Sequence, residues 1–398
     1  MDQISANRAA IGTPPQLTDS ARAVLRTLSA CGPITRPQLS SMLALSKPTM
    51  SMAVAELSAR GLVASRGLSR GPTGRTAILY GIGPAAGYVV GVDAGTTHVR
   101  AVATSLDGRI LAKNEERLPG AAPWSTGRVS GTVRAVMDAL LQSLASCGGP
   151  LRAVAVALPM IVSNSRSIPG MYTASDPMLR VLRQHNAPLV LENNVNCAAL
   201  AELHHGAASG WSGFVYLQVG VKIGLGIVHD RRLFRGFNGG AGEVGRLPFP
   251  WSATEVPRRE GLEQYLGSGQ LLKRVLAGWP DDSGPAPANA EELFAFAAAG
   301  SAPALAAVQK HADDIGRLVS ACIGVLDPGL VVLGGGVGQN PLVVDRVRRV
   351  VSDLAWPTEI AVTSLGSWAT VQGAAHLAAE YSLGELLGDN GHPAVVLG

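Results

Sequence analysis

The sequence predicts an α/β protein in which a small N-terminal winged helix-turn-helix precedes a larger body. Two short helices and a hairpin follow one another between residues 35 and 79, which is the element order of that motif. In the rest of the chain, glycine-rich loops follow apolar strands three times. Charge also divides the chain, because residues 1–80 carry nine Lys and Arg against three acids (+6), while the remainder carries a net −2.

Composition narrows the class of protein. The 398 residues are 47% hydrophobic, yet no apolar run approaches the roughly 18 residues that a membrane helix needs. No leader of charged, apolar and small residues opens the sequence. The cysteines lack C-x-x-C spacing, so neither a disulfide framework nor a metal cluster is indicated. We therefore expect a cytoplasmic protein without membrane insertion, cofactor or metal.

The N-terminal region is expected to hold a disordered tail over 1–17 and a winged helix-turn-helix over 18–80. A Pro/Gly-rich linker over 81–87 then leads to the body, 88–398. Small polar residues mark the helix starts: Asp19 or Ser20 for the first helix, Thr35 for the second and Ser46 for the third. The second helix is expected to bury Leu39, Met42 and Leu43.

The third helix is predicted to be the one that reads DNA. Met50, Val54 and Leu57 recur at helical spacing and must face the core. The side chains predicted to reach base edges are therefore Lys47, Thr49, Ser51 and Met52. The hairpin that follows suits phosphate or narrow minor-groove contact through three arginines, Arg66, Arg70 and Arg75. A helix-turn-helix can also serve as a protein-docking element, and a basic surface can simply be solvated.

The body begins with an apolar strand, 88–93, that ends on an acid followed by small residues. Such an acid can hold a metal-bound nucleotide, and small residues let backbone N–H groups approach phosphate. A β-hairpin turn alone would read in the same way, but two further glycine loops follow strands at 220–226 and 330–336. The candidate nucleotide-loop residues are Asp93, Gly95, Thr96, Thr97, Gly220, Gly224, Gly226, Gly334, Gly335 and Gly336. No P-loop or dinucleotide fingerprint is present.

Two further segments carry a resemblance to a known family. The segments 241–245 (AGEVG) and 192–196 (ENNVN) resemble the ROK family (repressors, open reading frames, kinases), and the likeness to its transcriptional-regulator branch covers about 20–385. The resemblance implies two RNase H-like lobes of the actin/hexokinase ATPase type. The first would cover about 88–195 with a C-terminal helix at about 370–386, and the second about 196–369. Family kinases bind sugar between the lobes, near residues that match Asn193, Asn194, Glu243, Arg246 and Glu263.

Departures from the family pattern argue against catalysis. Family kinases read Glu-Asn-Asp, with the Asp as general base, whereas this chain has Asn194, an amide that cannot accept the proton. The family's zinc-binding His is Arg246 here, and its cysteines are missing from 250–261, so no metal site is expected. Lys222 stands where the second glycine loop usually keeps glycine, and Ala-Leu-Pro-Met over 157–160 replaces Gly-x-Pro-Gly. No catalytic residue is assigned.

Arg246 has two interpretations. It could favour an effector that bears phosphate or carboxylate. Alternatively, it could pair with Glu243 or Glu263 and brace the loop where zinc is bound in other members.

The leading hypothesis is a DNA-binding transcriptional regulator of carbohydrate metabolism, most simply a repressor. Its partners would be double-stranded operator DNA, a sugar or sugar-phosphate effector, and further copies of itself in a homodimer or homotetramer. The inactive kinase-like body would be sensor and dimerisation unit. One alternative is an ATP-dependent sugar kinase, and another is a regulator controlled by protein contact whose cleft binds nothing.

Overall fold

The computed structural model describes residues 17–70, 76–119, 124–163, 176–389 and 395–397. The chain forms two compact units. The first comprises Met1–Val162, Gly170–Asn194 and Ala374–Gly398, and the second comprises Ser163–Pro169 and Val195–Gly373. The divisions at 194/195 and 373/374 lie close to the lobe boundaries expected from the sequence.

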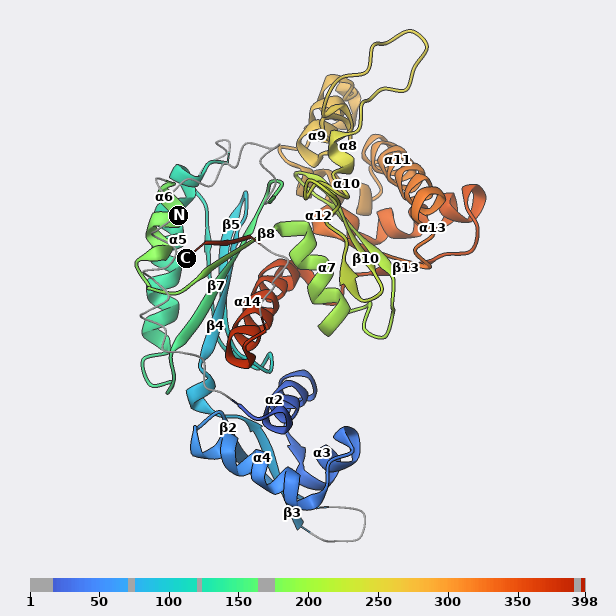
Figure 1. Ribbon diagram of the computed structural model, residues 1–398. Coiled ribbons are helices and arrows are strands. Elements are labelled where there is room, and N and C mark those ends of the chain that lie inside the picture. The colour runs from blue at the N-terminus through green and yellow to red at the C-terminus, as the bar shows by residue number, and fades with distance from the viewer. Residues whose placement is uncertain (1–16, 71–75, 120–123, 164–175, 390–394, 398) are drawn as a thin grey trace. The chain divides into compact units, whose positions relative to one another are not determined.

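The described part of the first unit starts at Leu17 and opens with three helices and a small sheet, drawn in blue in Figure 1. The helices are α2 (Asp19–Cys31), α3 (Arg36–Leu43) and α4 (Lys47–Ala59). The strands pair in the order β1–β3–β2 and are β1 (Ile34–Thr35), β2 (Val63–Arg70) and β3 (Thr76–Ile82). Three helices followed by an antiparallel hairpin confirm the predicted winged helix-turn-helix.

The start of α2 differs from the prediction. Thr18 caps this helix, rather than Asp19 or Ser20, and its hydroxyl accepts from the Ala21 N–H at 3.3 Å. The same hydroxyl donates to Glu56 of α4 at 2.6 Å, so the cap also joins two helices. Leu17, assigned to the disordered tail, is instead buried, with 5% of its surface exposed. The other residues of that predicted tail lie outside the described part of the chain.

The apolar face of α3 is narrower than the sequence suggested. Leu39 is fully buried, but Met42 is 57% exposed, so its predicted burial is wrong. The helix ends at Ala44, which has a left-handed conformation (φ 51°), one turn after Leu39. Leu39 is thus the one residue of this short helix that the neighbouring elements fully cover.

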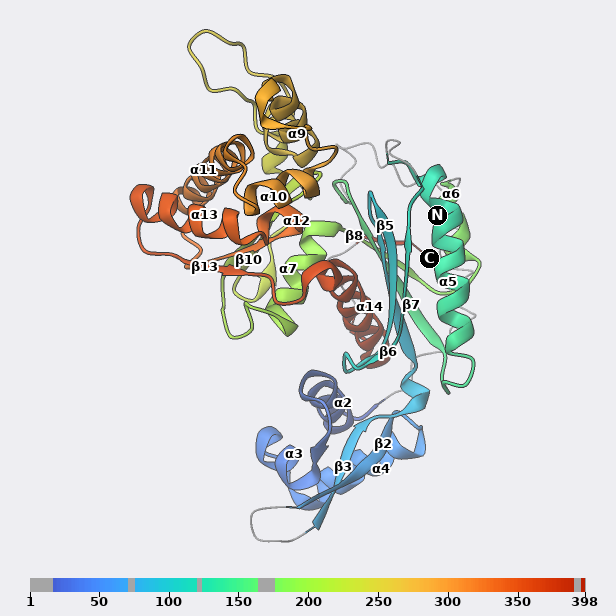
Figure 2. The same ribbon diagram turned by 180° about the vertical axis from the view of Figure 1, so that it is seen from behind.

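Six strands form the sheet of the first unit's body, in the order β14–β8–β7–β4–β5–β6. The strands β4, β5 and β6 are antiparallel, whereas β7 and β8 run parallel to β4. Helices α5 (Thr126–Ser143) and α6 (Pro177–Arg183) lie together on one face of this sheet (Figures 1 and 2). The strands are β4 (Tyr88–Ala94), β5 (His98–Ser105), β6 (Ile110–Arg117), β7 (Leu151–Leu158), β8 (Leu189–Asn193) and β14 (Val395–Leu397).

The predicted linker is structured. β3 extends to Ile82, and a short 3-10 turn, η2 (Pro84–Ala86), follows. The Arg152 guanidinium of β7 donates to the Ala85 and Ala86 carbonyls at 2.7 and 3.0 Å. On α2, Ser29 donates to the Leu106 carbonyl at 2.6 Å. The two Arg152 bonds fix the linker turn to β7, and the Ser29 bond joins α2 to the body of the first unit.

The second unit repeats the same sheet order. Its strands run β11–β10–β9–β12–β13, with β9, β10 and β11 antiparallel and with β12 and β13 parallel to β9. The strands are β9 (Phe214–Val219), β10 (Ile223–His229), β11 (Arg232–Leu233), β12 (Leu330–Gly334) and β13 (Glu359–Val362). Two sheets in which an antiparallel triplet meets a parallel pair confirm the two RNase H-like lobes.

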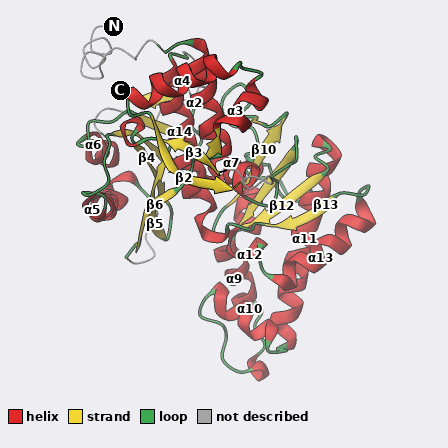
Figure 3. Cartoon of the chain, turned by 90° about the horizontal axis from the view of Figure 1, so that it is seen from below, coloured by secondary structure: helices red, strands yellow, loops and turns green. Residues whose placement is uncertain are grey.

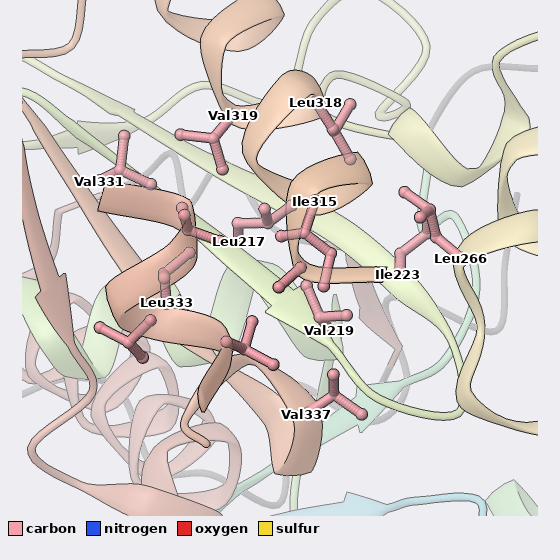
Figure 4. Packing of buried hydrophobic residues seen from close by; sticks show 14 of the residues in the cluster. Leu217, Val219, Ile223, Leu266, Ile315, Leu318, Val319, Val331, Leu333 and Val337 are labelled. Atoms are coloured by element: carbon pink, nitrogen blue, oxygen red, sulfur yellow. The ribbon is translucent and has the colours of Figure 1, made fainter. Parts of the chain in front are cut away.

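Helices cover both faces of this second sheet. α11 (Ala302–Leu326) and α13 (Pro341–Leu354) lie side by side (Figure 3) and pack against the strands through a large apolar core (Figure 4). α7 (Asn194–His205) covers the opposite face. The other helices of this unit are α8 (Gly261–Leu266), α9 (Ser268–Ala277), α10 (Ala290–Ala298) and α12 (Gly335–Gly338). α14 (Ala369–Leu387) begins in this unit and belongs to the first unit from Ala374 onward.

No single described helix is long and apolar enough to cross a bilayer. α10 and α11 pass that test only as a pair, with a bend of 111° at the break between them.

Candidate functional site

The N-terminal half of α4 presents a polar face. Ser46 caps the helix as predicted, because its hydroxyl accepts from the Thr49 N–H at 3.3 Å. Met50, Val54 and Leu57 are buried, which fixes the rotation of the helix about its axis. Lys47, Ser51 and Met52 consequently lie exposed, while Thr49 is half-buried. This face has the chemistry that a recognition helix needs at base edges.

The hairpin places its arginines in different environments. Arg70 is exposed at the end of β2. Arg66 donates from its guanidinium to the Ile82 carbonyl at the base of the hairpin, so part of its donor capacity is used within the domain. Arg75 lies outside the described residues. Arg36 of α3 was not among the residues predicted from the sequence. Its guanidinium lies 4.7 Å from the centre of the Tyr80 ring.

The first predicted nucleotide loop contains a three-membered charge network. Asp93 of β4 lies directly opposite Arg100 of β5, and Arg100 lies opposite Glu115 of β6. The guanidinium is 3.8 Å from Asp93 and 2.6 Å from Glu115. Burial raises the pKa of Asp93 to about 7, although Arg100 offsets part of that shift. The acid that would hold a metal-bound nucleotide thus has a cationic partner within its own sheet.

Replacing Asp93 by asparagine is expected to change how stability depends on pH. A carboxyl whose folded pKa is above its unfolded value of 3.8 stabilises the fold at low pH and loses that contribution as the pH rises toward 7. Relative to the unmodified chain, the Asp93→Asn variant should therefore gain on the order of 4 kcal/mol at most between pH 4 and pH 8. Urea unfolding across that range measures the difference.

The exposed Asp353 of α13 supplies the control for this experiment. Asp353→Asn is expected to keep the pH profile of the unmodified chain. If the Asp93→Asn profile also runs parallel to it, the buried acid is not protonated in the folded protein.

Most glycines of the other two loops serve packing. A Cβ on Gly224 would lie 2.8 Å from Val195 of α7, and one on Gly226 would lie 2.7 Å from Ala199. A Cβ on Gly334 would collide with the Tyr216 hydroxyl, and Gly335 combines a φ of 79° with the nearby Val219 carbonyl. These glycines let the helix and the strands approach one another closely. This packing role was not predicted from the sequence.

The remaining loop glycines have open surroundings. A Cβ on Gly336 would meet nothing within 4 Å, and one on Gly220 would lie 3.8 Å from the Gly336 nitrogen. The loops after β9 and β12 therefore meet at these two residues.

In the first loop, Thr96 is half-buried and Thr97 is exposed, and Gly95 packs against the His98 carbonyl.

Two predicted sugar contacts lie at the junction of β8 and α7. The Asn193 carboxamide donates to the Met160 carbonyl at 3.1 Å, and its backbone N–H donates to Glu192 at 2.8 Å. The bond to Met160 fixes the orientation of the carboxamide. Asn194, the first residue of α7, is half-buried.

The other predicted sugar contacts gather in the second unit. Arg246 lies 3.3 Å from Glu243 and 3.6 Å from Glu260, and Glu263 lies beside Gly245 of the same loop. Burial raises the pKa of Glu243, while Arg246 lowers it. Arg246 therefore pairs with Glu243, as one of its two interpretations expects, but its second partner is Glu260 rather than Glu263. Glu260 was not predicted as a partner of Arg246. Its position depends on a left-handed backbone conformation (φ 61°) just before α8, which the sequence pattern does not indicate.

Within the described residues, no group of three or more His, Cys, Asp or Glu side chains could hold a metal ion. The Arg246 cluster supplies one cation and carboxylates, which can exchange hydrogen bonds with hydroxyl groups.

A winged helix-turn-helix joined to two RNase H-like lobes defines a class of DNA-binding proteins built on a sugar-kinase fold. Residues 89–381 match the ROK family, and the chain belongs to that family. It is 24% identical over 374 residues to the xylose repressor of Bacillus subtilis, an alignment that covers 90% of this chain and 94% of the relative. The N-acetylmannosamine kinase of Pasteurella multocida is 28% identical over 256 residues, covering 62% and 80%.

Solved structures show the same fold. A ROK family transcriptional regulator, a homologue of the Escherichia coli MLC protein, superposes with a TM-score of 0.71 at 19% identity, covering 92% of this chain and 96% of its own. A ROK glucokinase from Streptomyces griseus in complex with glucose and AMPPNP gives a TM-score of 0.60 at 24% identity, covering 74% and 100%.

Proposed function

We propose that this protein is a transcriptional repressor of carbohydrate genes, whose affinity for operator DNA is set by a sugar. The observation that carries the proposal is the exposed N-terminal face of α4, held by a capped helix in a winged helix-turn-helix ahead of a ROK body. The Bacillus subtilis relative named a xylose repressor spans nearly the whole chain, whereas the glucokinase structure covers 74% of it. Xylose is therefore the first effector to test.

The decisive experiment is a genomic-fragment selection with the full-length protein, followed by footprinting and titration with xylose. A protected near-palindrome beside carbohydrate genes, released by the sugar, supports the proposal. A two-fold site would also fit a homodimer or a pair of dimers. A protein that enriches no fragment at modest salt, or that responds only to another protein, would favour the alternative of control by protein contact.

The effector itself is expected to be neutral. Because Arg246 is already paired with Glu243 and Glu260, it should bind a phosphate less strongly than an unpaired arginine would. Displacement of bound xylose, which reports this cluster alone, should therefore show no preference for xylose 5-phosphate over xylose.

Glu263→Gln is expected to weaken xylose binding about 10- to 100-fold, since a charge-assisted hydrogen bond contributes about 1.5–3 kcal/mol. The exposed Glu255 supplies the matched control, Glu255→Gln. Preferential displacement of bound xylose by the phosphorylated sugar would show that Arg246 faces the ligand.

The body is proposed to be a sensor rather than an enzyme, in a cytoplasmic protein. Asn194 cannot act as general base, and Asp93 is engaged by Arg100. A coupled assay with ATP and xylose or glucose is expected to give no turnover above background. Turnover by the unmodified chain would establish the alternative, an ATP-dependent sugar kinase, because such an enzyme works without the Asn194→Asp change.

A further inference from the structure

A cavity of about 450 Å³ lies in the second unit between α9 and α11. It shares no residue with the Glu243, Arg246 and Glu263 cluster. Its wall combines apolar and polar side chains, chiefly Leu271, Val275, Trp279, Arg274, Lys310 and His311. Its volume is within the range of pockets that hold small molecules.

His311 is the unusual member of this wall. Its side chain is 1% exposed, and neither ring nitrogen has a hydrogen-bond partner among the described residues. Burial, with the nearby Arg274 and Lys310, lowers its pKa to about 4, so the ring is neutral near pH 7. A neutral imidazole carries one donor and one acceptor. A ligand hydroxyl can form a hydrogen bond with one of these ring nitrogens. Leaving both nitrogens buried without a hydrogen bond destabilises the folded protein.

The cations of the wall are held in place by Tyr265. Arg274 stacks 4.3 Å from the centre of the Tyr265 ring and donates to its carbonyl at 2.5 Å. Lys310 donates to the Tyr265 hydroxyl at 2.6 Å and to Asp314 at 2.9 Å. Asp314 is also paired with Arg317 at 2.6 Å. Among the residues that line the cavity, Arg274 and Lys310 are cations and Asp314 is the one acid, so this wall carries a net positive charge.

We infer that this cavity is a second small-molecule site, which takes a small hydroxylated anion such as a sugar acid or a sugar phosphate. The anionic group is bound by Arg274 and Lys310, which can still donate to it because a guanidinium has five N–H donors and an ammonium group has three. A hydroxyl of the ligand forms a hydrogen bond with one ring nitrogen of His311. Trp279 and Leu271 cover the ligand's carbon skeleton. The inference does not depend on the proposed repressor function.

The test is isothermal calorimetry on the full-length protein with gluconate, glucose 6-phosphate and glucose as probes. At least one anion should bind saturably and more tightly than glucose. Arg274→Ala should weaken that anion about 10- to 100-fold, as expected for loss of a charge-assisted hydrogen bond. The exposed neighbour Lys273 provides the charge-matched control, Lys273→Ala, which should leave binding unchanged, as should Glu243→Gln in the other cluster.

A second variant separates ligand binding from a structural role. His311→Leu replaces a buried ring that has no hydrogen-bond partner with an apolar side chain of similar size. The variant should therefore raise the Tm by a few degrees and weaken anion binding about tenfold. Three results would overturn the inference: absence of binding by both anions, binding that Glu243→Gln abolishes but Arg274→Ala does not, or a His311→Leu variant that melts lower and binds normally.

Discussion

Lys47→Ala is expected to weaken operator binding about 5- to 150-fold. The side chain is exposed at the first residue of α4, where a recognition helix approaches base edges. A direct base contact contributes about 1–3 kcal/mol of discrimination, and a phosphate contact contributes to affinity through counterion release. Fluorescence anisotropy with the selected operator, at several salt concentrations, measures both effects.

The salt dependence tells the two kinds of contact apart. Loss of a phosphate contact should reduce the slope of log K against log salt by about one and should weaken all sequences equally. Loss of a base contact should keep the slope and relax specificity at one position. Lys273→Ala on α9 removes the same charge far along the sequence and should have no effect. Unchanged operator affinity in Lys47→Ala would mean that α4 does not enter the groove.

Local signals predicted much of the winged helix-turn-helix. Met50, Val54 and Leu57 set the rotation of α4, and Ser46 caps it, because both depend only on spacing along one helix. The prediction for α2 was wrong by one or two residues. Thr18, Asp19 and Ser20 are all competent caps, and contact with Glu56 of another helix favours Thr18. The predicted burial of Met42 was wrong for the same reason, since tertiary contacts decide which apolar residues of a short helix are covered, and here they cover only Leu39 fully.

The charge networks were harder to predict. Asp93, Arg100 and Glu115 are spaced seven and fifteen residues apart, and only the register of β4, β5 and β6 places them in one row. Register depends on turn geometry, which the sequence did not fix. Arg246 was expected to pair with a neighbouring acid, but the choice of Glu260 depends on a left-handed residue before α8.

Two glycines of the third glycine loop, Gly334 and Gly336, have different surroundings. Gly334→Ala would drive a methyl group into the Tyr216 hydroxyl, between the central strands β9 and β12. Overpacking of a well-packed core typically destabilises by 1–3 kcal/mol and sometimes more, so a loss of about 3 kcal/mol is expected. Urea denaturation and the Tm, which should fall by roughly 6–12 °C, measure it.

Gly336→Ala is the matched control, two residues further on. Its Cβ would meet nothing within 4 Å, and the residue lies in the short helix α12, where alanine is favoured over glycine by about 1 kcal/mol or less. The two variants should therefore change stability in opposite directions. Equal effects would mean that Tyr216 moves aside without penalty, and the packing role assigned to Gly334 would be wrong. A large loss in Gly334→Ala alone would mean that this glycine persists for packing, whether or not the loop still binds a nucleotide.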